Sequence, residues 1–157
     1  MIRDRDSDDL QPCIELLAEV HGHDRYPLHW PTDPYRWLSP RDLLHAWVAT
    51  AAGATVVGHL AVRGSAGSAE VCRLFVAPAF RRDRVATRLL EQVRRWAADR
   101  GIDLMLEVVD TERSPAVALY ERTGWQHTDT ETAKWTDPDG GPVTLLRYTL
   151  PGATGPR

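Results

Sequence analysis

The chain has 157 residues, of which 43% are apolar and 26% are charged, and its formal net charge is −3. This length and composition suit one globular domain with a sizeable core, which we expect over residues 1–150. The slightly acidic balance argues against a nucleic-acid-binding protein, because such proteins usually carry a basic excess.

The N-terminal segment predicts a short strand at residues 2–3 followed by a helix. Asp6 or Ser7 can cap that helix, and the acidic residues at 8–9 suit its positive end. The start of the chain lacks an apolar core, so no signal peptide is expected. The buried stripe of the helix is expected at Leu10, Cys13, Ile14 and Leu17.

Residues 21–42 hold four prolines, two tyrosines, two tryptophans and three histidines. Proline at this density excludes one long helix, although a short helix beginning at Pro40 stays open. Aromatic residues on a loop form a lid, form a binding surface, or simply pack on the sheet. A metal site at His21, His23 and Asp24 lacks a fourth ligand at a telling spacing, so no metal is expected.

Residues 43–62 carry no Asp, Glu, Lys or Arg and are long enough to cross a bilayer. The histidines, threonines and glycines within this stretch favour two strands joined by a turn at residues 52–54 instead. Cys13 and Cys72 occupy apolar positions without metal-ligand spacing, which indicates buried thiols in a reducing compartment. We therefore expect a cytoplasmic protein without a membrane partner.

Residues 70–100 predict a strand, a tight turn and a long helix. The strand Glu70–Val76 is ended by Pro78, and the apolar residues from Val85 onward follow one helical face as far as Gly101, where a left-handed cap is expected. A helix that starts in a tight turn presents unpaired N–H groups, which can bind an anion. The basic residues Arg81, Arg82 and Arg84 oppose the helix dipole and suit a phosphate site, with a solvated basic turn as the alternative.

Residues 104–150 are expected to form a strand, a helix and a final pair of strands. Residues 104–109 form a strand that should lie parallel to the strand at 70–76, because a helix connects them. A helix capped by Ser114 follows, with Gly124 as its stop. Strands at 130–135 and 143–150 flank a strong turn signal, and we expect residues 151–157 to be a disordered tail.

Two stretches resemble the signature motifs of the GCN5-related N-acetyltransferase (GNAT) superfamily. The run Leu74-Phe75-Val76-Ala77-Pro78 and the turn Arg81-Arg82-Asp83-Arg84-Val85-Ala86 are similar to its phosphate-binding motif, and Ala116 to Trp125 is similar to its second motif. The sequence departs from the family pattern at two positions. Arg84 stands where glycine is usual, and it either crowds the cofactor or adds a contact to a phosphate. Arg113 stands where asparagine is usual.

The resemblance implies the fold and the activity. It implies an α/β (α+β) fold with a mixed, mostly antiparallel twisted sheet, whose central parallel strands splay around an acyl-CoA site and are flanked by about four helices. It implies transfer of the acetyl group of acetyl-CoA directly to a primary amine of a small molecule or peptide, through a ternary complex. A degenerate member that binds acyl-CoA or a partner without turnover is the alternative, and the oligomeric state stays open, with a homodimer as a common arrangement in the family.

The resemblance also assigns roles to residues. Tyr120 matches the family's general acid, and Glu70 matches a position that often carries a base acting through water, with His59 and His29 as weaker candidates for the base. The acceptor amine is expected at Tyr26, His29, Trp30 and Trp37, where Asp24 and Asp33 suggest a cationic acceptor. The cofactor is expected at Phe75, Val76, Arg81, Arg82, Asp83, Arg84, Val85, Ala86 and Thr87.

Overall fold

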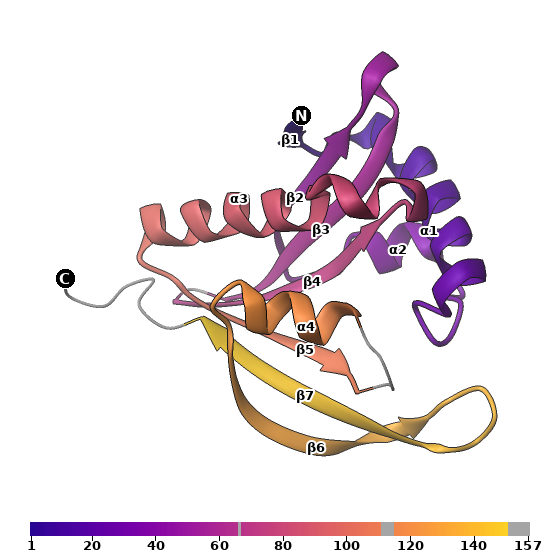
Figure 1. Ribbon diagram of the computed structural model, residues 1–157, viewed down its shortest axis with the longest axis vertical. Helices are drawn as coiled ribbons and strands as arrows, with labels where there is room; N and C mark the ends of the chain where they lie inside the picture. Colours follow the sequence, from indigo (N-terminus) through magenta and orange to yellow (C-terminus); the bar gives the residue numbers. More distant parts are fainter. Residues whose placement is uncertain (66, 111–114, 151–157) are drawn as a thin grey trace.

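The computed structural model describes residues 1–65, 67–110 and 115–150. These residues form a seven-stranded sheet with the order β1-β2-β3-β4-β5-β7-β6 (Figure 1). The strands are β1 (Ile2–Asp4), β2 (Leu43–Thr50), β3 (Val56–Ser65), β4 (Ser68–Val76), β5 (Asp103–Val109), β6 (Gln126–Thr136) and β7 (Pro142–Leu150). Among these described strands β4 and β5 are parallel and the other neighbours are antiparallel, which confirms the expected mixed, mostly antiparallel sheet.

Four α-helices and three 3₁₀ turns connect the strands in the described part of the chain. The helices are α1 (Leu10–Asp24), α2 (Pro34–Leu38), α3 (Val85–Arg100) and α4 (Pro115–Arg122). The 3₁₀ turns are η1 (Ser7–Asp9), η2 (Ala52–Ala54) and η3 (Pro78–Asp83). The strand predicted at residues 104–109 is confirmed as β5, which begins one residue earlier, at Asp103.

The N-terminal turn η1 is capped as its acidic residues suggest. The Asp6 side chain accepts a hydrogen bond from the backbone of Asp8, and the Asp9 carboxylate accepts one from the backbone of Asp6, each at 2.8 Å. The Arg3 guanidinium on β1 donates a hydrogen bond to each carboxylate oxygen of Asp9 at 2.8 Å, and these bonds lower the pKa of the carboxyl. Asp9 as a residue is 5% exposed. This ion pair ties the first strand to the start of α1.

Helix α1 buries a different stripe from the expected one. Cys13 and Leu17 are buried as predicted, but Leu16 and Val20 complete the stripe, while residues 10 and 14 stay half-buried. The helix is apolar on more than one side, so packing against the sheet decides which side faces inward.

The short helix in the proline-rich region starts earlier than Pro40. The Asp33 side chain caps α2 by accepting a hydrogen bond from the backbone of Arg36, and Pro34 occupies the first turn, where its missing N–H is not needed. Residues 40–43 form a turn instead of a helix, closed by the bond from Leu43 N to Pro40 O at 3.0 Å, and lead directly into β2. The Asp-Pro pair was the stronger start signal.

The uncharged stretch 43–62 forms β2, η2 and most of β3. No helix in the described ranges is long and apolar enough to cross a membrane.

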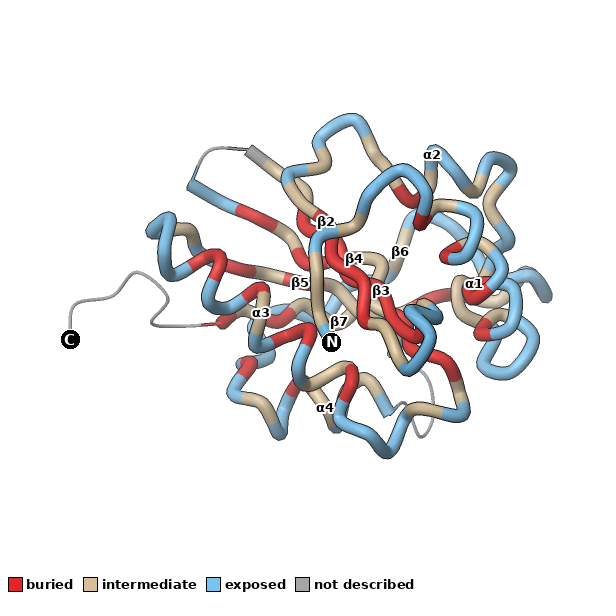
Figure 2. The backbone as a smooth tube through the Cα atoms, turned by 90° about the horizontal axis from the view of Figure 1, so that it is seen from above, coloured by how far each residue is buried: buried red, intermediate tan, exposed pale blue. Residues whose placement is uncertain are grey.

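Strands β2–β4 lie between α1 and α3 (Figure 2). Helix α3 comes very close to β3, because a Cβ atom at Gly58 would lie 2.9 Å from Cγ1 of Val85 and 3.2 Å from Cδ1 of Leu89. The predicted α3 stripe is confirmed, and the helix ends at Gly101 in the left-handed conformation. Its buried residues are Val85, Leu89, Leu90, Val93, Trp96 and Ala97.

The C-terminal hairpin is longer than predicted. Strand β6 begins at Gln126 and pairs with β7 along its length, although its residues are almost all exposed. Arg113 and the expected cap Ser114 lie outside the described residues, as does the expected tail at 151–157.

Candidate active site

The sheet opens between its two central strands. Strands β4 and β5 pair only over residues 68–71 and 103–106, yet β4 continues to Val76 and β5 to Val109. Beyond the paired segment the two strands diverge (Figure 1). Backbone groups that face this gap therefore have no neighbouring strand to bond.

A bulge distorts β4 beside the gap. His59 pairs with Phe75 and Ala61 pairs with Cys72, so the β4 segment between these pairs contains one extra residue. Arg73 sits within it at φ 55°, a conformation that residues with a side chain rarely adopt. Such bulges bend a strand and change the direction of the residues that follow.

After the bulge, the Val76 amide faces the gap. Hydrogen-bonded and non-hydrogen-bonded pairs alternate along an antiparallel ladder. Because the N–H of Ala77 donates to the carbonyl of Val57 at 2.8 Å, the neighbouring Val76 directs its own N–H and C=O away from β3. By the same alternation, the backbone N–H and C=O of Phe75 point toward β3. Of the two strand residues expected to contact the cofactor, Val76 therefore has the backbone N–H that is available to a ligand in the gap.

The turn after β4 ends in a left-handed residue directly before α3. Arg84 adopts the left-handed conformation, φ 61° and ψ 24°, at the position where glycine is usual, and its side chain is exposed. This conformation costs a residue with a side chain about 1–2 kcal/mol. Val85, Ala86 and Thr87 then form the first turn of α3, where N–H groups have no partner inside the helix.

Among the basic residues of this turn, Arg81 already has protein partners. Its guanidinium forms an ion pair with Asp24 at the end of α1 and donates to the carbonyl of Val76 at 3.2 and 3.4 Å. It therefore ties α1 to the end of β4. Arg82 and Asp83 are exposed in η3.

Tyr120 on α4 is buried beside the gap. Its ring packs against Trp125 and Tyr148, with ring centroids 6.1 Å apart in each case, and the residue is 7% exposed. Burial raises the pKa of the phenol, so it stays protonated at neutral pH. Within the described residues its hydroxyl has no hydrogen-bond partner.

Tyr26 approaches the same place from the loop after α1. Burial raises the pKa of its phenol, while the charge of Arg73 lowers it and the phenol of Tyr120 raises it further. The Tyr26 ring and the Arg73 guanidinium both lie against the Trp37 ring. The buried phenol of Tyr120 and the half-buried phenol of Tyr26 therefore come from separate segments.

Glu70 lies on β4 within the last paired residues, opposite Met105 on β5. Burial raises the pKa of its half-buried carboxyl, and the negative charge of Glu107 raises it further. Glu107 follows the last paired residue of β5 and is bonded to Arg147 at 2.7 Å. Glu107 was not predicted as a site residue, although a lone acidic residue within an apolar strand was a signal for it.

The remaining predicted residues divide into two groups. Nε2 of His29 is 2.6 Å from the Thr136 carbonyl oxygen, and Trp30 is 41% exposed. Trp37 instead packs at the bulge, with its ring 4.2 Å from the Arg73 guanidinium carbon and 6.1 Å from the ring of Tyr26. The structure therefore brings Tyr26 and Trp37 together, whereas His29 lies beside the β6–β7 hairpin and the Trp30 ring packs against His21.

His59 is unsuited to the role of a base. It is fully buried, its two ring nitrogens contact Arg5 and the carbonyl of Arg73, and burial lowers its pKa to about 3. No group of three or more His, Cys, Asp or Glu side chains in the described ranges is arranged to hold a metal ion.

Comparison with known families decides the assignment. The model of the Acetyltransferase (GNAT) family matches residues 10–125. The chain belongs to the GNAT family. This match covers both motifs and the elements that surround the gap. No curated protein sequence matches the chain.

Solved GNAT structures share the whole fold at low sequence identity. The ribosomal-protein-S18-alanine N-acetyltransferase from Escherichia coli has a TM-score of 0.75 and 19% identity, with 96% of this chain and 93% of that chain covered. An aminoglycoside 6'-N-acetyltransferase complexed with coenzyme A has a TM-score of 0.72 and 15% identity, with coverage of 100% and 98%. NAA60 from Arabidopsis thaliana with acetyl-CoA has a TM-score of 0.73 and 14% identity, with coverage of 95% and 97%.

Proposed function

We propose that this GNAT protein transfers the acetyl group of acetyl-CoA directly to a primary amine of a small molecule or peptide. The observation that carries the proposal is the gap between β4 and β5, into which the Val76 amide faces. The same strand runs directly into the basic turn at the start of α3. A thioester and the phosphates of its carrier thus have adjacent sites on one continuous segment.

The residues present fit acetyl-CoA. The first-turn amides at 85–87 suit its pyrophosphate, with Arg82 and Arg84 as exposed cations beside them. Arg81 contributes through its backbone and by holding the turn, because its side chain is engaged with Asp24. The left-handed backbone at Arg84 keeps the turn that glycine usually provides, which supports a working site over a degenerate one.

Each remaining role falls to a residue at the gap. The Val76 N–H donates to the thioester carbonyl oxygen and stabilises the oxyanion that develops there. Glu70 takes a proton from the amine through water, and the raised pKa of its carboxyl makes it a better base. As the amine nitrogen bonds to the carbonyl carbon and the C–S bond breaks, Tyr120 gives its proton to the departing sulfur.

Direct transfer also agrees with the state of the cysteines. Burial raises the pKa of Cys13 to about 12 and that of Cys72 to about 11, so both stay as thiols at neutral pH. A thiol is a poor nucleophile compared with a thiolate. An acyl-cysteine intermediate therefore has no support among these residues.

The test is release of free thiol from acetyl-CoA against a panel of amines. We expect Tyr120→Phe to lower the amine-dependent rate by about 10²–10⁴-fold, as for loss of a general acid. The matched control is Tyr148→Phe, because the Tyr148 ring neighbours Tyr120 but its hydroxyl donates to Glu121 at 3.0 Å. Equal rates for the two variants would remove the acid role from Tyr120.

Calorimetric titration with acetyl-CoA separates the two interpretations of the family resemblance. Binding with no thiol release across the panel would favour a member that binds acyl-CoA without turnover. Absence of binding at millimolar acetyl-CoA would reject both interpretations.

A further inference from the structure

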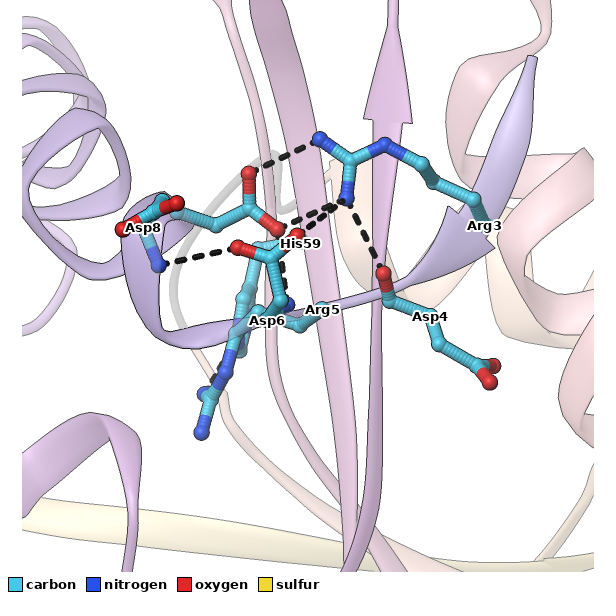
Figure 3. Close-up of polar contacts among 7 residues, drawn as sticks. Arg3, Asp4, Arg5, Asp6, Asp8 and His59 are labelled. Carbon is cyan, nitrogen blue, oxygen red and sulfur yellow. Dashed lines mark hydrogen bonds and ion pairs between the residues drawn. The ribbon is translucent and has the colours of Figure 1, made fainter.

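His59 lies in the interior of the sheet, where both of its ring nitrogens have a partner. Its side chain is 0% exposed. Nη1 of Arg5, the residue after β1, lies 3.0 Å from Nε2 of His59, and Nδ1 lies 2.8 Å from the carbonyl oxygen of Arg73 (Figure 3 shows Arg5 and His59). The imidazole therefore connects the end of β1 to the bulge of β4.

These partners determine the tautomer of His59. A guanidinium has only donors, so Nε2 must accept the hydrogen bond from Arg5. Nδ1 then carries the proton and donates to the carbonyl of Arg73. Burial, together with the charges of Arg5 and Arg73, lowers the pKa of His59 to about 3, although the hydrogen bond to the Arg73 carbonyl and the charge of Asp9 act in the opposite direction. The ring is therefore neutral at physiological pH and holds one fixed orientation.

Arg5 is also anchored by groups other than His59. Its guanidinium donates to the carbonyl of Leu38 at 2.8 Å and to the hydroxyl of Ser39 at 2.6 Å. Its backbone N–H donates to the carbonyl of Ala46 at 3.0 Å. Arg5 is thus fixed by the segment after α2 and by β2, and it can hold the imidazole in place.

The other end of this chain of contacts is the strained residue of the bulge. Arg73 has φ 55°, and such a conformation persists only where the surrounding structure holds it. His59 holds its carbonyl, while the Arg73 side chain donates to the carbonyl of Trp37 at 2.9 Å and lies over the Trp37 ring. The bulge is thereby held in place through both the backbone and the side chain of Arg73.

We propose that His59 and Arg5 are positioning residues for acetyl transfer, which hold the bulge at Arg73 and so fix the direction of the Val76 amide. This inference rests on the proposed function, because it assumes that the Val76 amide meets the acyl group. The bulge lies only a few residues before that amide on the same strand. A displaced donor stabilises the oxyanion less, so loss of the anchor should lower kcat more than it raises the KM of the acceptor.

Three variants separate positioning from general stability. His59→Leu removes both hydrogen bonds, and we expect kcat to fall about 10–100-fold, as for misplacement of a catalytic group. His59→Asn keeps a donor near Nδ1 and should recover part of this loss. Val62→Ala is the control, because Val62 is buried on the same strand but pairs with Val71, outside the bulge. It should lower Tm without the loss in kcat.

Nuclear magnetic resonance gives a readout that needs no turnover. We expect the ¹⁵N signals of His59 to show a neutral ring protonated at Nδ1, without titration between about pH 5 and 8, where an ordinary histidine titrates. His59→Leu should shift the amide signals of residues 73–76, and Val62→Ala should leave them in place.

Two results would overturn the inference alone. One is a His59 ring that titrates near the ordinary value of about 6.5. The other is an active wild type in which His59→Leu lowers kcat no more than Val62→Ala does. A wild type that releases no thiol with any amine would overturn the proposed function and the catalytic part of this inference together, while the resonance signals would still report whether the anchor exists.

Discussion

Replacing Arg84 by glycine should stabilise the protein. The backbone at Arg84 has φ 61° and ψ 24°, and its side chain caps nothing at the start of α3. Glycine adopts this left-handed conformation without steric strain, so the substitution should add about 1–2 kcal/mol to the free energy of unfolding. Glycine loses about 0.5–1 kcal/mol of this through its greater freedom in the unfolded chain. The net gain of about 0.5–1 kcal/mol corresponds to a rise in Tm of about 1–4 °C for a domain of this size.

Two further substitutions isolate the backbone effect from the loss of charge. Arg84→Ala removes the same charge but keeps a Cβ atom, so its stability should stay within about 0.5 kcal/mol of the wild type. Arg82→Gly also removes an arginine, but Arg82 is not among the residues with positive φ. We therefore expect Arg82→Gly to destabilise the protein by about 0.5–1 kcal/mol.

Thermal and urea unfolding measure the stabilities, and titration with coenzyme A measures the role of the side chain. If the Arg84 guanidinium binds a phosphate, Arg84→Ala and Arg84→Gly should weaken binding equally. If its Cβ atom obstructs the cofactor, Arg84→Gly alone should bind more tightly. An Arg84→Gly variant no more stable than Arg84→Ala would refute the argument from the backbone conformation.

Four other substitutions test the capped N-terminus, the aromatic residues and the acidic pair. Asp9→Asn should destabilise by about 2 kcal/mol at pH 7, because charge-assisted hydrogen bonds are lost. Since the folded-state pKa of Asp9 is lowered, this difference should shrink as urea unfolding is repeated below about pH 4. Trp30→Ala should raise the acceptor KM with little change in Tm, whereas Trp37→Ala should lower Tm because its ring packs at the bulge. Glu107→Gln should lower the pKa of Glu70, so the rise of kcat/KM with pH should move to lower pH; an unmoved profile would count against Glu70 as the base.

Local patterns predicted the elements that local interactions determine. The stripe of α3 and its glycine stop were predicted correctly, because a single amphipathic face and a left-handed cap are properties of adjacent residues. The extent of β6 was not predicted, because its polar sequence becomes a strand only by pairing with β7. The choice of buried stripe on α1 likewise depends on the sheet it meets.

The residues of the candidate site also divide into those that local sequence predicts and those that depend on distant partners. The turn that contains Arg84 follows directly from the sequence motif, but its left-handed backbone at an arginine required the structure. His59 was a candidate base because histidine titrates near neutral pH, yet its partner Arg5 lies 54 residues away along the chain. Glu107 gained its significance only when β5 was placed beside both Glu70 and Arg147.

The proposed acceptor side is assembled from segments that no local pattern connects. His29 contacts the carbonyl of Thr136, which is 107 residues further along the chain, and Arg25 forms an ion pair with Asp139 at 3.7 Å. The proposed donor side, in contrast, is one continuous run from β4 through η3 into α3. A sequence motif can therefore identify the donor while leaving the acceptor undetermined. Loop 25–33 and the β6–β7 hairpin contact each other through these two pairs. Exchanging either segment should therefore change which amine is accepted, while the binding of acetyl-CoA is retained.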